Sequence, residues 1–398
     1  MTARVVIVAD DLTGAMDVAG PLADRGLATL AVASREGCTR RDLESGAVIS
    51  INADSRHLSA ADAARCMQRI GSDLLDPGAE IVIKKIDSTL RGNVVGETLA
   101  MMEVTGRSIA AIAPAFPDQK RTVRGGMVHV EGVALPDTNF ARDALTPPPL
   151  QPLHLLFART AHGSAVQLLR AGQAPRLLDP GQRQILVFDA ESDADLEQIV
   201  RNLQPELKRV LLVGSAGIAQ AVGRVCFAGA LPSMRSPSVA GRILIVVGSR
   251  AEQSAEQVRR VLQLGSTERF IAPNGVVAGD AIARSQAQLL VLQATASADG
   301  PESDAAVVAR RMADGATALL ARGGIGAVVV TGGDTAIAIL QGLGQSTLRV
   351  IGTLLPGIPY SRIKGPAGEL LFVTKAGGFG APDTFHTIAT RLRTGGNL

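Results

Sequence analysis

Short runs of apolar and mostly β-branched residues recur along the whole chain, and each run ends in small or acidic residues. Runs of this kind are typical of strands that are buried on both faces of a sheet. The predicted strands are Val5–Ala9, Val48–Ile51, Glu80–Ile86, Ile109–Ala113, Ile185–Phe188, Val210–Val213, Ile243–Val247, Leu289–Leu292, Ala327–Val330 and Leu370–Val373. Stretches rich in Ala, Leu, Arg and Gln lie between them and predict helices over Ala60–Leu75, Asp193–Leu203, Ala251–Leu264, Glu302–Ala321 and Thr335–Leu343. Alternating strands and helices indicate an α/β fold with largely parallel sheets flanked by helices.

The alternation breaks once, near Leu231–Ser238. This stretch is rich in Pro and Ser and has no apolar periodicity, as is typical of a linker, and a new predicted strand starts soon after it. A chain of 398 residues is long enough for two domains. We therefore expect an N-terminal domain over residues 1–232 and a C-terminal domain over residues 240–398, each with its own sheet, and an active site in the cleft between them.

Composition excludes several classes of protein. Hydrophobic residues make up 46% of the chain and charged residues 19%, which is typical of a globular protein. The formal net charge of +3, the absence of Trp and the single Tyr argue against a nucleic-acid partner. The first apolar run is interrupted by Asp10 and Asp11, so it is neither a signal peptide nor a membrane span. The three cysteines are far apart and match no metal-ligand spacing, so a reducing, cytoplasmic location is expected.

Two adjacent carboxylates, Asp10 and Asp11, follow the first predicted strand. Ligands of open α/β sheets bind at the carboxyl ends of the strands. Carboxylates at this place can accept hydrogen bonds from the hydroxyls of a polyol or take a proton from one. Thr13 is expected to cap the helix that follows. The alternative is that Asp10 or Asp11 only caps this helix.

A denser polar segment, Lys84–Asn93, follows the third predicted strand. Alternate side chains of a strand share a face, so Lys85 and Asp87 should point the same way and Lys84 the opposite way. Ser88 should lie at the start of the next helix with Arg91 one turn in, and an arginine can bind a carboxylate through two parallel hydrogen bonds. The alternative is a solvated strand end without a ligand. The expected substrate-binding residues are Asp10, Asp11, Lys85, Asp87, Ser88, Arg91 and, after the second strand, Arg56.

Three glycine-rich turns stand at strand ends in the second half, at Gly248–Arg250, Thr331–Ala336 and Lys375–Gly380. Glycine lets the backbone approach a phosphate closely, and a helix N-terminus offers it unpaired amides. One such turn also arises for steric reasons alone, but three in one domain indicate a nucleotide-phosphate site. Neither a Walker A motif nor a dinucleotide-binding fingerprint is present. The expected nucleotide-binding residues are Ser249, Thr331, Gly332, Gly333, Asp334, Thr335, Gly377 and Gly378.

In these motifs the chain resembles the four-carbon acid sugar kinases, formerly a domain of unknown function. The matching segments are Ala9–Ala15, Lys84–Asn93, Pro114–Pro117, Gly248–Ser249, Thr331–Thr335 and Lys375–Gly380. The resemblance implies an N-terminal domain that binds the acid sugar and a C-terminal domain that binds the nucleotide. It also implies transfer of the γ-phosphate of ATP, with Mg²⁺, to the terminal hydroxyl of D-threonate, D-erythronate or a 3-oxo-tetronate.

This resemblance leads to a mechanistic hypothesis. Arg56, Lys85 and Arg91 would hold the carboxylate of the substrate, and Asp11 or Asp87 would orient its hydroxyls. Asp11 and Asp334 are rival candidates for the general base, and the ligands of Mg²⁺ stay open. The alternatives are a dehydrogenase or aldolase that acts on similar acids, or a non-catalytic sensor of sugar acids. The only partner expected is a small molecule, with neither nucleic acid nor membrane, and a homodimer is compatible with the composition.

Overall fold

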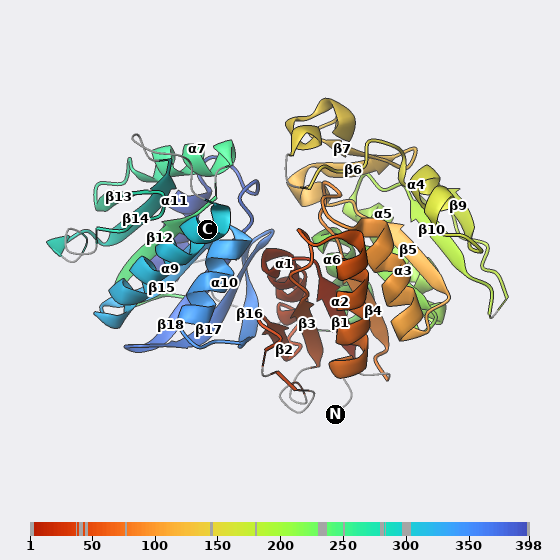
Figure 1. Ribbon diagram of the computed structural model, residues 1–398, viewed down its shortest axis with the longest axis horizontal. Helices are drawn as coiled ribbons and strands as arrows, with labels where there is room; N and C mark the ends of the chain where they lie inside the picture. The colour runs from red at the N-terminus through yellow and green to blue at the C-terminus, as the bar shows by residue number, and fades with distance from the viewer. Residues whose placement is uncertain are drawn as a thin grey trace. The chain divides into compact units, whose positions relative to one another are not determined.

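The computed structural model of the chain contains two compact units (Figure 1). The structure describes residues 4–36, 38–39, 43, 47–75, 78–143, 146–179, 181–229, 237–249, 251–278, 282, 284–296 and 304–395. The first unit comprises Met1–Ala31 and Cys38–Leu231, and the second comprises Val32–Gly37 and Pro232–Leu398. The linker predicted at Leu231–Ser238 falls mainly on residues 231–236, which lie outside the described residues, so it stays a prediction.

The first unit is built on a sheet with the strand order β2-β3-β1-β4-β11-β5-β10-β9. The pairs that β1 forms with β3 and β4, and those that β11 forms with β4 and β5, are parallel. The inner strands are buried along their whole length, which explains why they appear in the sequence as unbroken apolar runs. The strands are β1 (Val5–Ala9), β2 (Thr29–Val32), β3 (Val48–Asn52), β4 (Ile81–Lys85), β5 (Ile109–Ala113), β9 (Ala165–Leu169), β10 (Gln184–Phe188) and β11 (Val210–Gly214).

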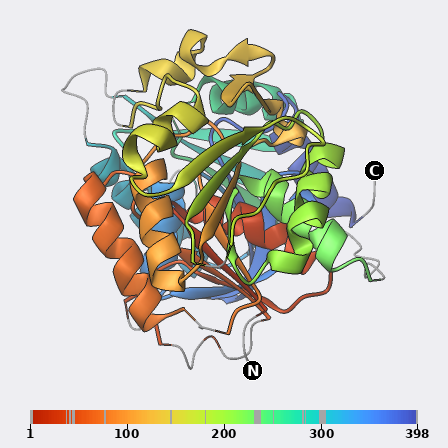
Figure 2. The same cartoon turned by 90° about the vertical axis from the view of Figure 1, so that its right-hand side faces the viewer.

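Helices cover both faces of this sheet. The helices α2 (Ala60–Asp73) and α3 (Val94–Thr105) pack together on one face, whereas α5 (Asp193–Leu203) and α6 (Ala216–Cys226) pack together on the other (Figure 2). Beside α6 lies α1 (Leu12–Ala23), and α4 (Leu153–Thr160) contacts β9 and β10.

A small antiparallel sheet of β6 (Arg121–Arg124), β7 (Met127–Val130) and β8 (Val133–Ala134) is also part of this unit. Short 3-10 turns flank it, namely η2 (Pro117–Gln119), η3 (Leu135–Asp137) and η4 (Asn139–Arg142).

The ends of the helices follow from local chemistry. Asp11 caps α1, because its side chain accepts a hydrogen bond from the amide of Gly14. Ser192 and Asp195 form a reciprocal capping box at the start of α5. Gly106 ends α3 in the left-handed conformation that glycine adopts without strain.

The second unit contains a mixed sheet with the order β13-β14-β12-β15-β18-β17-β16. From β13 to β18 the neighbouring strands are parallel, and β17 pairs antiparallel with both β18 and β16. The strands are β12 (Arg242–Val247), β13 (Thr267–Pro273), β14 (Leu289–Thr295), β15 (Ile325–Thr331), β16 (Thr347–Leu355), β17 (Ile358–Gly365) and β18 (Gly368–Lys375). The core on one face includes Ile245, Val329 and Val373 of the strands and Phe385 of a covering helix.

The helices of the second unit pack in two pairs, α9 with α10 and α7 with α11. Their bounds are α7 (Glu252–Val261), α9 (Ala305–Ala321), α10 (Gly333–Gly342) and α11 (Thr384–Thr394). The predicted α/β class with two units and largely parallel sheets is confirmed, although the antiparallel edge of β16 and β17 was not predicted. Within the described part of the chain, every helix is too short or too polar to cross a membrane.

Candidate functional site

Three neighbouring strands of the first unit carry the predicted acid-sugar residues to one edge of the sheet. The last residue of β1, Ala9, is paired with Asn52 of β3 on one side and with Lys85 of β4 on the other. The segments that follow these strands therefore begin side by side, because parallel strands end at the same edge. Asp10 and Asp11 follow β1, Arg56 follows β3, and Asp87 follows β4.

Arg56 is surrounded by carboxylates. Its Nε donates to Asp10 Oδ2 at 2.7 Å, its Nη2 lies 2.9 Å from Asp11 Oδ1, and Asp87 Oδ1 is 4.0 Å away. The arginine is largely buried and Asp10 is only 3% exposed. These carboxylates raise the pKa of Arg56 well above its usual value, although burial opposes them. Arg56 thus joins the ends of all three strands.

Arg91 is likewise bound to a carboxylate of the protein. Its Nε and Nη2 donate to the two oxygens of Asp87 at 2.8 and 3.1 Å, and its Nη1 lies 3.6 Å from Asp143 Oδ2. Burial raises the pKa of Asp87, but Arg91 and Arg56 outweigh it and hold this pKa well below its usual value. Arg56 and Arg91 are therefore paired with aspartates of the protein. Their expected binding to a substrate carboxylate stays a prediction.

In the described structure, Lys85 differs from Arg56 and Arg91 because its ammonium donors are not used in hydrogen bonds to the protein. It is 4% exposed and, among the described residues, its side chain makes no hydrogen bond or ion pair. A methyl group added to Gly14 would lie 2.7 Å from Lys85 Nζ and 2.6 Å from Asp11 Oδ1, so the ammonium lies against the first turn of α1. A buried ammonium with unused donors is costly unless a ligand accepts from it.

Asp11 is held by α1 as well as by Arg56. Its two oxygens accept from the Thr13 hydroxyl at 2.6 Å and from the Gly14 amide at 2.9 Å. Burial raises its pKa, but Arg56 and Lys85 outweigh burial and lower it. The prediction that Thr13 caps the helix is wrong, because Asp11 does so and Thr13 lies inside α1. Capping by Asp11, which the sequence presented as the alternative to a role in the site, therefore does not remove Asp11 from the predicted site residues.

Lys84 and Lys85 lie on opposite faces of the sheet. Lys84 is fully buried and pairs with Glu97 of α3 at 2.7 Å. The other oxygen of Glu97 accepts from the Ser55 hydroxyl at 2.9 Å, and Lys84 donates to the carbonyl of Lys85 at 2.8 Å. This buried network fixes the neighbours of both Arg56 and Lys85. The sequence analysis did not single out Glu97.

The segment between β4 and α3 is a loop rather than the start of a helix. The expectation that Arg91 lies one turn inside a helix is wrong, since α3 begins only at Val94. Leu90 adopts a left-handed conformation, with φ 61°, and Asp87 Oδ2 accepts from the Thr89 hydroxyl. Ser88 is 3% exposed and lies next to Asp87 in this loop.

Asp17 of α1 interacts electrostatically with Lys85 and Asp11, although the sequence analysis did not select it. It is 5% exposed and its Oδ1 has no hydrogen-bond partner in the described part of the structure. Burial raises the pKa of Asp17 to about 7, and Lys85 opposes this change. A sequence signal existed, because Asp17 stands three residues after Gly14 and hence on the same face of the helix.

In the second unit the three glycine-rich turns meet around Ser249. A methyl group on Gly332 would lie 3.5 Å from the Ser249 amide, and one on Gly377 would lie 2.1 Å from the Ser249 hydroxyl oxygen. A methyl group on Gly248 would collide with the side chain of Thr335. These contacts require glycine at Gly248 and Gly377, and the φ of 103° requires it at Gly332, so the steric and phosphate-binding interpretations apply to the same residues.

The first turn of α10 offers unpaired amides. Gly332 precedes the helix with φ 103°, and no side chain caps the helix. The amide of Gly332 donates to the Lys375 carbonyl at 3.3 Å, whereas those of Gly333, Asp334 and Thr335 make no hydrogen bond to described residues. Such a helix start binds anions. The side chain of Thr331 instead faces α7 and lies 3.5 Å from the Ser254 hydroxyl, so only its backbone borders the turn.

The turn after β18 contains amides that are not used in hydrogen bonds to described residues. The carbonyls of Gly377 and Phe379 accept hydrogen bonds from the side chains of Ser254 and Gln257. The amides of Gly377 and Gly378 have no partner among the described residues. A methyl group on Gly378 would meet nothing within 4 Å, so the space beside the Cα of this residue is open. These turns fit the phosphates of a nucleotide. Arg250, the last residue of the first predicted turn, lies outside the described residues.

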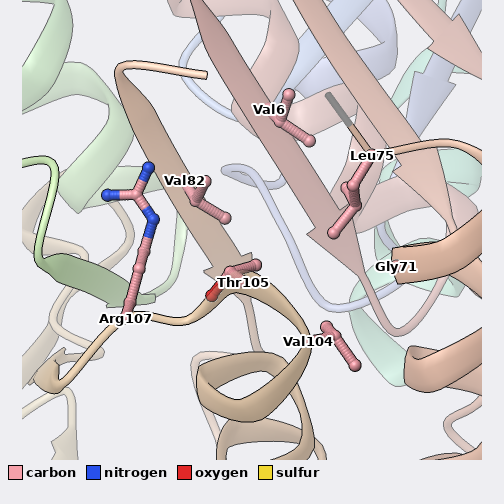
Figure 3. A pocket seen from close by; sticks show the side chains of 7 residues that line it. All are labelled: Val6, Gly71, Leu75, Val82, Val104, Thr105 and Arg107. Atoms are coloured by element: carbon pink, nitrogen blue, oxygen red, sulfur yellow. The ribbon is translucent and has the colours of Figure 1, made fainter. Parts of the chain in front are cut away.

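A separate small cavity of about 110 Å³ lies away from the predicted site residues (Figure 3). It is lined by Val6 and Val82, near the amino ends of β1 and β4, together with Leu75, Val104 and Arg107. The guanidinium of Arg107 is taken up by backbone carbonyls, among them those of Ala79 and Val210. None of the predicted acid-sugar or nucleotide residues lines this cavity.

Comparison with known families matches both halves of the chain. The model of a sugar-binding N-terminal domain matches residues 5–222, and that of a nucleotide-binding C-terminal domain matches residues 244–385. A D-threonate kinase of Bordetella bronchiseptica is 32% identical over 97% of this chain and 97% of its own length. This chain belongs to the four-carbon acid sugar kinase family.

Other members of the four-carbon acid sugar kinase family carry different substrate names. A D-erythronate kinase of Heliobacterium modesticaldum is 29% identical and covers 98% of this chain and 97% of itself. A 3-oxo-tetronate kinase of Pseudomonas savastanoi pv. phaseolicola is 28% identical and covers 97% and 96%. The fold is shared with a crystal structure titled putative tRNA synthase from Salmonella typhimurium LT2, with a TM-score of 0.74, 20% identity, and coverage of 98% of this chain and 99% of that one.

Proposed function

We propose that this protein is an ATP-dependent kinase that transfers the γ-phosphoryl group to the terminal hydroxyl of a four-carbon acid sugar. The observation that carries this proposal is the pairing of two different sites in one chain of this family. The first unit gathers Asp, Arg and Lys side chains at strand ends, and the second gathers glycine turns with unpaired amides around Ser249. A sugar acid requires the former and a triphosphate the latter.

The acid sugar would bind through Lys85 and the carboxylates that surround it. Lys85 is the partner we assign to the substrate carboxylate, because Arg56 and Arg91 already hold Asp10, Asp11 and Asp87. Hydrogen bonds to charged groups contribute about 1.5–3 kcal/mol each. The oxygens of Asp11 and Asp87 would accept hydrogen bonds from the sugar hydroxyls. Four-carbon acids that differ at C2 and C3 would be distinguished by which of these oxygens they reach.

Asp11 is better suited to orient a hydroxyl than to remove its proton. Its pKa is lowered by Arg56 and Lys85, which makes it a weak base. Phosphoryl transfer passes through a loose transition state and depends more on positioning and charge neutralisation than on a strong base. We therefore assign Asp11 to orienting the acceptor hydroxyl, while Asp334 stays a candidate for the base.

The nucleotide would be held by the second unit. When bound, ATP supplies the phosphoryl group, and Mg²⁺ neutralises its charge. The amides of Gly333, Thr335 and Gly378 would donate to phosphate oxygens, and Ser249 borders all three turns. Among the described residues no cluster of three or more metal-ligating side chains occurs. This fits Mg²⁺, which binds through phosphates, waters and one or two carboxylates, of which the exposed Asp334 is the candidate.

A coupled assay of ADP release tests the function. The purified chain is incubated with Mg²⁺-ATP and, one at a time, with D-threonate, D-erythronate, L-threonate and a 3-oxo-tetronate, with glycerol as an uncharged control. We expect ADP release with at least one of the acids and none with glycerol. ADP release with none of them, or turnover of an acid with nicotinamide cofactor in place of ATP, would refute the proposal. Binding of an acid without turnover would indicate the sensor instead. A homodimer stays a separate prediction, which light scattering after size-exclusion chromatography measures.

A further inference from the structure

Lys375 is a fully buried lysine at the end of β18, beneath the third glycine turn. Its Nζ donates to the carbonyls of Ala376 at 2.8 Å, Gly377 at 3.2 Å and Phe379 at 2.9 Å. Three donors are all that an ammonium group possesses. The ring centre of Phe385 on α11 lies 5.7 Å from Nζ. The turn is thus wrapped around the ammonium group of the residue that precedes it.

Helix α7 holds the same turn from another side. The Ser254 hydroxyl donates to the carbonyl of Gly377 at 3.0 Å, and Gln257 Nε2 donates to those of Phe379 at 2.9 Å and Ala381 at 3.0 Å. The carbonyls therefore point inward to Lys375 and α7. The amides of Gly377 and Gly378 have no acceptor among the described residues and are left for an outside anion.

Among the residues that the structure describes, no carboxylate pairs with Lys375. In the described part of the structure it makes no ion pair, and burial alone lowers its pKa to about 7. A buried cation without a counter-ion is costly, so an anion bound near the turn would stabilise it. The charged and titratable groups on the helices around it are Glu252, Glu256, Arg259 and Arg260 of α7, Asp334 of α10, and Asp383, His386, Arg391 and Arg393 at or in α11. On the strands they are Tyr360, Arg362 and Lys364 of β17 and Glu369 of β18.

We propose that Lys375 is a positioning residue of the nucleotide site. Protonated, it holds the carbonyls of Ala376, Gly377 and Phe379 inward so that the amides face the polyphosphate, and the polyphosphate supplies the negative charge that the buried ammonium lacks. This inference rests on the proposed function of the second unit. It assigns a role to a residue that touches the turn and not the nucleotide.

Because proton binding and nucleotide binding are linked, the proposal predicts the direction in which nucleotide affinity changes with pH. A nearby polyphosphate favours the protonated lysine and so raises its pKa above that of the nucleotide-free protein. Between these two pKa values, nucleotide binding takes up a proton, so affinity is full below about pH 7 and falls as the pH rises. The dissociation constant should increase by at most about tenfold per pH unit, since one group titrates.

Isothermal titration of Mg²⁺-ATP into the full chain at pH 6, 7, 8 and 9 tests this inference. Measurement in two buffers of different ionisation enthalpy at each pH gives the number of protons taken up. For the wild type we expect weaker binding above pH 7 and uptake of up to one proton at pH 8. Lys375→Met and Lys375→Gln should bind at least about tenfold more weakly at pH 6, with no pH dependence above pH 7 and unchanged binding of the acid sugar.

The control is Lys364→Met, which removes an exposed lysine of β17 and should keep the wild-type pH dependence. His386 remains in every variant, so a loss of pH dependence in the Lys375 variants belongs to Lys375. If Lys375→Met does not fold, the proton uptake measured for the wild type and for Lys375→Gln still tests the role of Lys375. Binding by the wild type that is independent of pH from 7 to 9, or a Lys375→Gln variant that keeps the proton uptake, would overturn the inference. Absence of any nucleotide binding by the wild type would instead refute the proposed function.

Discussion

Replacing Arg56 by methionine tests the ion network that joins the ends of β1, β3 and β4. The guanidinium is largely buried and lies 2.7 Å from Asp10 Oδ2 and 2.9 Å from Asp11 Oδ1. Its removal leaves these buried carboxylates without their main partner. Breaking a buried ion pair from one side costs about 3–5 kcal/mol of stability. We therefore expect Arg56→Met to lower the free energy of unfolding by about this amount at pH 7.

The pH dependence of this loss follows from the carboxylates. In the wild type, Arg56 helps to hold the pKa values of Asp11 and Asp87 below the ordinary 3.8, so their contribution is full above about pH 4 and is lost as the pH falls through these lowered values. Without Arg56 both pKa values rise, and protonation then relieves the unpaired charges. The deficit of Arg56→Met relative to the wild type should therefore shrink as the pH is lowered from 7 towards 4.

Urea unfolding followed by far-ultraviolet circular dichroism measures both effects, since the chain has no Trp for fluorescence. The matched control is Arg201→Met, which removes an exposed i,i+4 pair with Glu197 at 2.6 Å and should cost less than about 1 kcal/mol at every pH. A deficit for Arg56→Met within 1 kcal/mol of the control at pH 7, or one that grows towards pH 4, would refute this account of the network.

Three further substitutions probe the first unit. Glu97→Gln leaves the fully buried Lys84 without its anion, so we expect a loss of about 3–5 kcal/mol in the same unfolding assay, and a loss below 1 kcal/mol would contradict the buried pair. Gly14→Ala places a methyl group 2.7 Å from Lys85 Nζ. We expect it to raise the KM for the acid sugar at least about tenfold and to leave the KM for ATP unchanged. The control Gly96→Ala, whose methyl group has room, should leave both KM values unchanged. Burial raises the pKa of Asp17 to about 7, so this carboxyl contributes stability at acid pH that is lost as the pH rises from about 4 to 7. Asp17→Asn should therefore gain stability relative to the wild type over that range. A difference in unfolding free energy that stays constant from pH 4 to 7 would argue against the raised pKa.

Much of the fold was predictable because its central strands are buried on both faces. Val5–Ala9 and Ile109–Ala113 were predicted with their observed bounds, and so was helix Asp193–Leu203. The short strands β6 to β8 were not predicted, because they are partly exposed and mix polar with apolar residues. Strand β16 alternates between buried and less buried residues, and β17, although buried over its first four residues, mixes Pro, Ser, Arg and Lys with apolar residues, so neither carries a continuous apolar run.

The candidate site was predictable as a set of residues but not as a set of contacts. Asp11, Lys85 and Arg56 were selected because each follows a strand, and parallel pairing places the ends of β1, β3 and β4 side by side. That both arginines bind aspartates of the protein depends on the course of two loops, which contain left-handed turns at Asp54 and Leu90. Two non-glycine residues in this conformation leave no clear signal in the sequence.

The buried charges were the least predictable part. Glu97 stands in a segment that looks like an ordinary helix, and Lys375 opens a glycine-rich turn that was selected for its backbone. Only tertiary packing shows that Glu97 bridges Lys84 and Ser55 or that Lys375 is enclosed by its own turn. A single sequence indicates which residue types are present at a strand end. It does not show which of them are already paired with each other.

Crossed binding of the two substrates tests the division of labour between the units most directly. Isothermal titration measures the affinities for the preferred acid sugar and for Mg²⁺-ATP in Lys85→Met and in Gly332→Val, where valine would be strained at φ 103°. We predict that Lys85→Met weakens the acid sugar about 10- to 100-fold with ATP affinity unchanged, and that Gly332→Val does the reverse. Loss of ATP binding in Lys85→Met, or of acid-sugar binding alone in Gly332→Val, would contradict the assignment of the two sites.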